Sequence, residues 1–245
     1  MKKLKGIYYV GMLFLFLWDI YYFYHMPPYQ ITVFWYIKVV VTIFICLYIS
    51  LILHETAHAA GYKKKGIQVE EMCIPMGIFS FPKQGRKVSF TPSFNLSNGY
   101  VTPYIEKITK EQEYHKYING IRFSLLAAPL FSLGIGIIGV MLFIFMKDSR
   151  LFWLFFSNFN IGICLNTLQC KEENYGDIYL YLLSKKNTNV LTAYLILALQ
   201  DNFIEEKEEY QNHYLVKQFQ NNLHQTTEKA GYLERSALSV INQMK

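Results

Sequence analysis

Long apolar runs constrain this chain more than any other feature of its sequence. An α-helix needs roughly 20 predominantly apolar residues to cross a hydrocarbon core of about 30 Å. Four stretches approach or exceed that length: residues 7–24, 31–53, 123–146 and 151–168. Hydrophobic residues make up 52% of the sequence and charged residues only 17%, a balance untypical of soluble proteins. The sequence therefore predicts an all-α membrane protein with about four transmembrane helices.

The segments outside these runs are of two kinds. Residues 66–104 are rich in Gly, Pro, Ser and β-branched or aromatic residues, which is typical of short strands and turns. We expect a small β-hairpin insertion there, with its turn at residues 83–86. From Ile178 onward the chain becomes polar and helix-forming. We therefore divide it into a transmembrane core, residues 1–183, and a helical cytoplasmic tail, residues 184–245.

Lysine and arginine in the loops predict the orientation. If the chain crosses four times, most loop cations share one side, and the other side carries only the turns at 25–30 and 147–150. Because cytoplasmic loops carry an excess of Lys and Arg, both termini of this multi-pass protein of the cell membrane should be cytoplasmic. The net charge of +6 then reflects topology and contact with the lipid bilayer. Without any nucleic-acid motif, it does not indicate nucleic acid as a partner.

Two charged residues interrupt the first two apolar runs. Asp19 precedes the turn at Pro27 and Pro28, and Lys38 follows it at a similar distance. An unpaired charge within a span is costly, so the two side chains either pair across this helical hairpin or reach the interface separately.

The motif that carries chemistry lies where the second apolar run ends, in the stretch SLILHETAHAAGYKKKG, residues 50–66. On a helix, His54 and His58 of HETAH are one turn apart on one face, so their imidazoles can converge on one metal ion. Glu55 points about 100° away and can reach a water molecule beside that ion. Two nitrogen ligands and one oxygen ligand suit Zn²⁺. The alternative is that these residues only mark the cytoplasmic end of the span.

A zinc site needs a third ligand on the same side of the membrane. Asp177 is the best placed candidate, because it follows Gly176 at the start of a new apolar helix after the fourth span. It could instead be an ordinary helix N-cap. The other carboxylates that could serve are Glu172 and Glu173, followed by Glu70 and Glu71.

Three blocks of the sequence resemble the site-2 protease family of intramembrane zinc metalloproteases, particularly its compact bacterial members. LHETAHAAGYKKKGIQVEEM is similar to the HExxH helix of the family and its continuation, and SLLAAPLFSLGIGI is similar to the third core span, with Pro129 in the matching place. LNTLQCKEENYGD resembles the last core block, in which Asn166 and Asp177 match an asparagine and the aspartate ligand. The chain departs from the family at Gln169, where proline is usual, and at Ile178, where glycine is usual.

The resemblance implies hydrolysis of peptide bonds in or beside the membrane. It implies that His54, His58 and Asp177 hold Zn²⁺, that Glu55 is the general base and that Asn166 binds the substrate backbone. The 66–104 hairpin would then present the substrate as an added strand.

Substrates of such a protease are membrane-associated peptides or proteins. We expect maturation of a secreted or modified peptide or bacteriocin, with export or transporter proteins as partners. The alternatives are regulated intramembrane proteolysis of a membrane-bound transcription regulator, and a catalytically inactive membrane scaffold or immunity protein. A transporter is disfavoured, because the sequence lacks paired broken helices and internal repeats.

Overall fold

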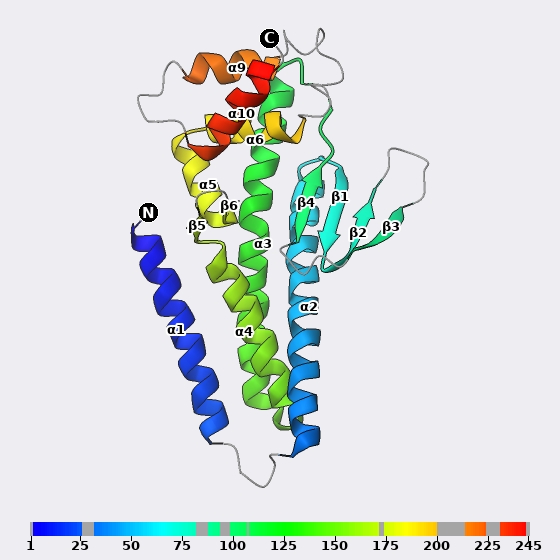
Figure 1. Ribbon diagram of the computed structural model, residues 1–245, viewed down its shortest axis with the longest axis vertical. Coiled ribbons are helices and arrows are strands. Elements are labelled where there is room, and N and C mark those ends of the chain that lie inside the picture. The colour runs from blue at the N-terminus through cyan, green and yellow to red at the C-terminus, as the bar shows by residue number, and fades with distance from the viewer. Residues whose placement is uncertain are drawn as a thin grey trace.

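The computed structural model describes residues 2–25, 32–81, 88–93, 99–106, 108–171, 174–199, 214–223 and 231–243. Within these ranges the chain is mostly helical. Figure 1 shows long helices lying side by side, a small sheet beside one end of α2, and short C-terminal helices gathered where α3 begins. The predicted class, a helical membrane protein with a small β insertion, agrees with this architecture.

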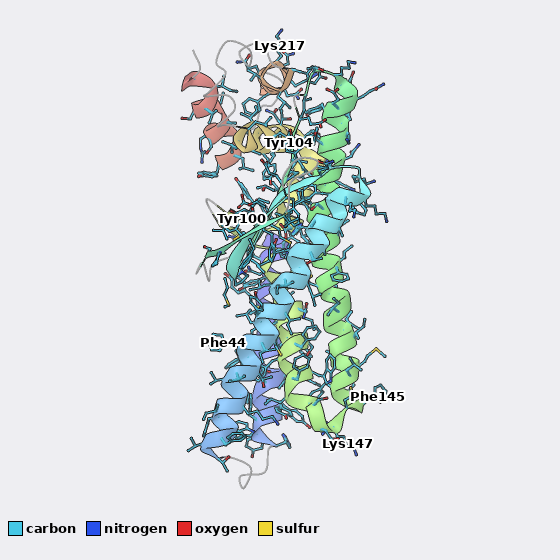
Figure 2. All side chains as sticks on the ribbon, turned by 90° about the vertical axis from the view of Figure 1, so that its right-hand side faces the viewer. Phe44, Tyr100, Tyr104, Phe145, Lys147 and Lys217 are labelled. Carbon is cyan, nitrogen blue, oxygen red and sulfur yellow. The ribbon has the colours of Figure 1, made fainter. Side chains whose placement is uncertain are left out.

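Three helices in the described part of the chain are long and apolar enough to cross a membrane. They are α1 (Lys2–Tyr24), α2 (Val33–Lys64) and α3 (Glu111–Phe145). Large apolar side chains point outward from them, such as Phe44 on α2 and Phe145 at the end of α3 (Figure 2). The helix α4 (Arg150–Asn166) has 17 residues, fewer than the other three. The structure thus gives three candidate spans where the sequence predicted about four.

The helix α2 is longer than the apolar run that predicts it. It begins after Thr32, whose hydroxyl accepts a hydrogen bond from the backbone N–H of Trp35, and it ends in Lys63 and Lys64. Cations in the last turn interact favourably with the negative end of the helix dipole. Because the helix continues beyond residue 53 to Lys64, the whole HETAH motif lies within regular helix.

The insertion between α2 and α3 is a sheet of four antiparallel strands. The strands are β1 (Val69–Ile74), β2 (Met76–Ser80), β3 (Ser89–Ser93) and β4 (Tyr100–Pro103), in the order β3-β2-β1-β4. The β-hairpin prediction was right in kind, but β4 adds an edge strand beside β1. Both β1 and β4 contact α2, so this edge lies next to the helix that carries the HETAH motif (Figure 1). The predicted turn at 83–86 lies outside the described residues.

Short helices follow α4. They are α5 (Asp177–Lys186), α6 (Asn189–Ala198), α9 (Tyr214–Leu223) and α10 (Tyr232–Gln243). Leu191, Leu195 and Ile196 of α6 are fully buried in a hydrophobic cluster shared with α3, α9 and α10. The C-terminal region is therefore helical as predicted, and it shares a hydrophobic core with the first half of α3.

Helix α1 packs chiefly on α4. The rings of Phe23 on α1 and Phe155 on α4 lie 6.3 Å apart, and Gly11 lets α1 approach Leu165. The sequence left two alternatives for Asp19 and Lys38, pairing across the hairpin or reaching the interface separately, and neither describes Asp19. The carboxylate of Asp19 accepts a hydrogen bond from the side-chain amide of Asn158, while Lys38 is exposed, so Asp19 turns inward to α4.

Candidate metal centre

Two helices bring three ligand-type side chains together. His54 and His58 lie on one face of α2, and Asp177 opens α5. The Nε2 atoms of His54 and His58 lie 3.3 and 3.2 Å from the same carboxylate oxygen, Oδ2 of Asp177. Together the three residues offer ligand atoms that all lie within 4.8 Å of one another. The residues that the sequence proposed as a metal site are thus neighbours in space, although Asp177 lies more than a hundred positions further along the chain.

A tight turn after α4 positions Asp177. The chain folds back through a two-stranded ladder, β5 (Cys170–Lys171) with β6 (Asn174–Tyr175), and the N–H of Gly176 donates to the carbonyl of Gln169. A Cβ at position 176 would meet the carbonyl oxygen of Thr167 at 2.3 Å. Glycine is therefore required there. Because Gly176 occupies the N-cap position of α5, Asp177 is the first helical residue and its carboxylate is directed to the histidines rather than to a capping bond.

Serines on α3 bind the far side of each imidazole. Ser132 Oγ lies 2.9 Å from Nδ1 of His54, and Ser124 Oγ lies 3.1 Å from Nδ1 of His58. The approach is close because α2 has Gly61 where it meets α3, and a Cβ there would lie 2.9 Å from the Cα of Ser124. Metal-bound histidines usually donate their second N–H to such a partner, which fixes the orientation of the ring. Sequence reasoning missed both serines, although their spacing of eight residues is a helical repeat.

The hydrogen-bond pattern fixes the tautomer of His58. Ser124 donates its only hydroxyl proton to the backbone carbonyl of His58, so Nδ1 of His58 must donate to Ser124 Oγ. A neutral imidazole then directs the Nε2 lone pair at an Asp177 oxygen, which repels it unless a cation lies between them. Protonated rings are the alternative to a cation: burial would raise the pKa of Asp177, but positively charged His58 and His54 donating to its carboxylate would hold that pKa well below its usual range.

The spacing of the ligand atoms fits zinc. In a tetrahedral site with bonds of about 2.1 Å, ligand atoms lie about 3.4 Å apart. The two Nε2–Oδ2 distances, 3.3 and 3.2 Å, are close to that value. Two imidazole nitrogens and one carboxylate oxygen are also the ligands of catalytic zinc sites with one open position. The donor set and its geometry therefore fit a catalytic zinc ion.

Glu55 lies beside this centre without belonging to the ligand cluster. Its side chain is buried, with 4% of the residue exposed, and it lines the same cavity as the histidines. A Cβ at Gly99, just before β4, would lie 2.6 Å from Oε1 of Glu55. The sheet edge thus lies close over Glu55, and a side chain at position 99 would force the Glu55 carboxylate to shift. No local pattern in the sequence indicates that contact.

The remaining predicted residues fall at different places. Asn166 ends α4 and lines the cavity, and its side-chain carbonyl accepts a hydrogen bond of 3.0 Å from the amide of Gln169. Among the carboxylates that were alternatives to Asp177 as third ligand, Glu71 accepts a hydrogen bond of 2.6 Å from the hydroxyl of Tyr100, and Glu70 is exposed on β1. Neither belongs to the metal-type cluster, and residues 172 and 173 lie outside the described ranges.

A cavity of about 840 Å³ connects these groups. Its walls come chiefly from α1, α2, α4, α5 and the start of β4, with one residue each from α3 and α6. The cavity therefore extends from the metal-type cluster down between the long helices. Apolar side chains such as Leu15, Phe155 and Phe159 line its lower part. The site is therefore open to a ligand that reaches it from within the helix bundle.

Comparison with protein families matches residues 42–244 to the model described as peptidase family M50. The matched range includes the HETAH motif, both serines of α3, Asn166 and Asp177. Searches of curated proteins and of solved structures find no match.

Proposed function

The chain belongs to peptidase family M50, the site-2 protease family of intramembrane zinc metallopeptidases, and from this premise we propose that it hydrolyses a peptide bond of a membrane-associated precursor. Membership makes it a membrane protease whose substrates are membrane-embedded proteins. The ligands, the base and the precursor are the parts that we propose here.

One observation carries the assignment of residues. The Nε2 atoms of His54 and His58 converge on one oxygen of Asp177 at 3.3 and 3.2 Å, with buried Glu55 beside them in the same cavity. We assign His54, His58 and Asp177 as zinc ligands and Glu55 as the catalytic base. Zinc bound there would act as a Lewis acid on the scissile carbonyl group and on the attacking water.

The residues of the chain perform the remaining steps. Glu55 takes a proton from the attacking water and passes it to the leaving amine, as a general base and then a general acid. Asn166 lies on the cavity wall, where its amide can bind the substrate backbone. The strand β4 is at an edge of the sheet, and its first residues line the cavity. An extended substrate can therefore add to this edge next to Glu55.

We further propose that α4 is a fourth crossing and that both termini are cytoplasmic. Its 17 residues span about 25 Å and return the chain from the turn at 147–149 to the level of the metal centre. The C-terminal helices, our residues 184–245, would then lie in the cytoplasm. Tyr194 of α6 lines the cavity, so this tail also forms part of the cytoplasmic wall of the site.

The precursor that we favour is a secreted or modified peptide or bacteriocin that the enzyme matures, in a bacterial cell membrane and alongside export or transporter proteins. A cytoplasm-facing site on a small protease suits a peptide that is trimmed before export. Cleavage of a membrane-bound transcription regulator would use the same residues.

The test is zinc content per chain in detergent-solubilised protein. We expect close to one zinc in the wild type, loss of zinc in His54→Ala and Asp177→Ala, and retention in Glu55→Gln, because Glu55 is not a ligand. His115→Ala is the matched control, since that histidine is exposed on α3.

Cleavage of membrane-inserted reporter peptides by the zinc-loaded protein then tests the reaction. Glu55→Gln should reduce the rate by about 10² to 10⁴-fold, the usual contribution of a general base. Folded wild type that takes up no zinc would contradict the proposed centre. Zinc-loaded wild type that cleaves no reporter or co-expressed precursor would favour the inactive scaffold instead.

A further inference from the structure

The cavity has a second polar position far from the metal centre. Asp19 of α1 and Asn158 of α4 both line it, and the side-chain amide of Asn158 donates a hydrogen bond to Oδ1 of Asp19. Neither residue takes part in the chemistry proposed above. Asp19 lies in an apolar stretch of α1, whereas Asn158 belongs to a short polar stretch of α4 together with Ser157 and Asn160.

The distance from the metal centre follows from α4. Asn158 and Asn166 line the same cavity and are eight positions apart, so about 12 Å of helix separates them. Phe155 and Phe159 line the cavity on the same helix, and Leu15 and Phe16 line it on α1. The cavity is therefore a groove with apolar walls, the metal centre at one end and the Asp19–Asn158 pair towards the other.

The charge of Asp19 is not balanced within this groove. Asp19, Glu55 and Asp177 line it, whereas no lysine or arginine does among the residues that the structure describes. A zinc ion at the proposed centre would offset Glu55 and Asp177 but not Asp19. Asn158 bonds one oxygen of the Asp19 carboxylate, and the described side chains give Asp19 no ion pair. A carboxylate within a span is expensive without a partner, and such residues usually mark the path of a substrate or an ion.

We propose that Asp19 and Asn158 form a subsite that binds a lysine or arginine side chain of the membrane segment of the substrate. This proposal rests on the proposed function, because it places the substrate in the groove that leads to Glu55. The cation would pair with the free oxygen of Asp19, while the flanking apolar side chains of the segment pack on the groove walls.

The spacing defines where the cation must lie in the substrate. An extended chain covers 12 Å in about four residues, at about 3.3 Å each, and a helical segment covers it in about eight. The substrate should therefore carry its basic residue about four to eight positions from the residue that contacts Asn166. The subsite would select membrane segments by the position of one charge.

A purely structural role for the pair predicts something different. If Asp19 and Asn158 only hold α1 against α4, the charge of a bound peptide should not affect its affinity. Peptide binding therefore separates the two roles.

The experiment uses the full-length Glu55→Gln protein in detergent, so that no peptide is consumed. The probes are fluorescent leucine-rich peptides of about 20 residues, each with one Lys, Leu or Glu at a single position that is moved along the sequence. We expect the best-placed Lys peptide to bind about tenfold more tightly than its Leu and Glu counterparts. The preference should disappear with Asp19→Asn and pass to the Glu peptide with Asp19→Lys. Asp148→Asn, an exposed carboxylate in the 147–149 turn, is the matched control and should keep the Lys preference.

Equal binding of Lys and Leu peptides at every position, with Asp19 intact, would overturn the proposal. That comparison needs no groove variant, so it stands even if Asp19 substitutions fail to fold. A Lys preference that survives Asp19→Asn would overturn it as well. Failure of the protease itself would appear separately, as missing zinc or missing cleavage, because peptide binding is measured without turnover.

Discussion

Ser124 binds His58 twice: its hydroxyl donates to the backbone carbonyl of His58 and accepts from Nδ1 of the same residue, each at 3.1 Å. The serine thus holds both the main chain and the ring of one proposed ligand. Ser132 holds only the ring of His54, at 2.9 Å. The orientation of the two imidazoles is consequently set by α3, a different helix from the one that carries them.

This arrangement predicts that the serines control metal affinity. Ser124→Ala and Ser132→Ala should each weaken zinc binding by about 10- to 100-fold, because the rings lose the partner that orients them. Competition with a zinc-selective chelator measures the affinity. Ser157→Ala is the control, since its buried hydroxyl bonds the carbonyl of Leu154 within α4. Unchanged zinc affinity in both α3 variants would show that the rings are oriented by other contacts.

Gly176 supports a second prediction. Gly176→Ala should reduce zinc binding, because its Cβ would meet the Thr167 carbonyl oxygen at 2.3 Å and push Asp177 away from the histidines. We expect a loss of about 10-fold or more, comparable to losing a supporting contact. Gly134→Ala on α3 is the control, because a Cβ there meets nothing within 4 Å. Full zinc affinity in Gly176→Ala would mean that the turn shifts without moving the carboxylate.

Local patterns in the sequence predicted much of this protein. The apolar runs located the long helices, and the spacing of His54 and His58 placed both imidazoles on one face. What the patterns could not predict are contacts between distant segments. The contacts of the α3 serines with the histidines, the fit of Gly99 over Glu55 and the bond from Asn158 to Asp19 depend on how whole helices pack. The helical spacing of Ser124 and Ser132 shows only that the two share a face, not what that face contacts.

Asp177 lies between these two cases. Its place at the start of an apolar helix on the same side of the membrane made it the best placed third ligand, and the resemblance supported it, but the turn at Gly176 that brings it to the histidines was not predicted. The apolar run also underestimates the length of α2. α2 extends to Lys64 although its apolar run ends at residue 53, because helix-forming and basic residues continue it into the polar region.

The close fit of Gly99 over Glu55 predicts a separation of activity from metal binding. Gly99→Ala should keep zinc, because Glu55 is not one of the ligands, but lower the cleavage rate by about 100-fold, since the new Cβ displaces the base. Parallel measurements of zinc content and reporter cleavage test this, again with Gly134→Ala as control. Loss of zinc in Gly99→Ala would indicate that the sheet edge supports the whole centre rather than Glu55 alone.

The proposed topology predicts which ends of the molecule are accessible from each side of the membrane. Lys147 and Lys217 lie at opposite ends of the long axis (Figure 2). Lys147→Cys, in the turn between α3 and α4, should react with a membrane-impermeant maleimide added to intact cells, and Lys217→Cys on α9 should react only after the membrane is opened.

Of the four native cysteines, 46, 73 and 164 are buried and should contribute little labelling. Wild-type protein measures the background, including that of Cys170. If α4 did not cross, its C-terminal end and the helices that follow would share a side with the turn at 147–149. Labelling of both positions in intact cells would therefore contradict a fourth crossing. Labelling of Lys217→Cys alone would instead reverse the orientation, and place the metal centre at the outer face.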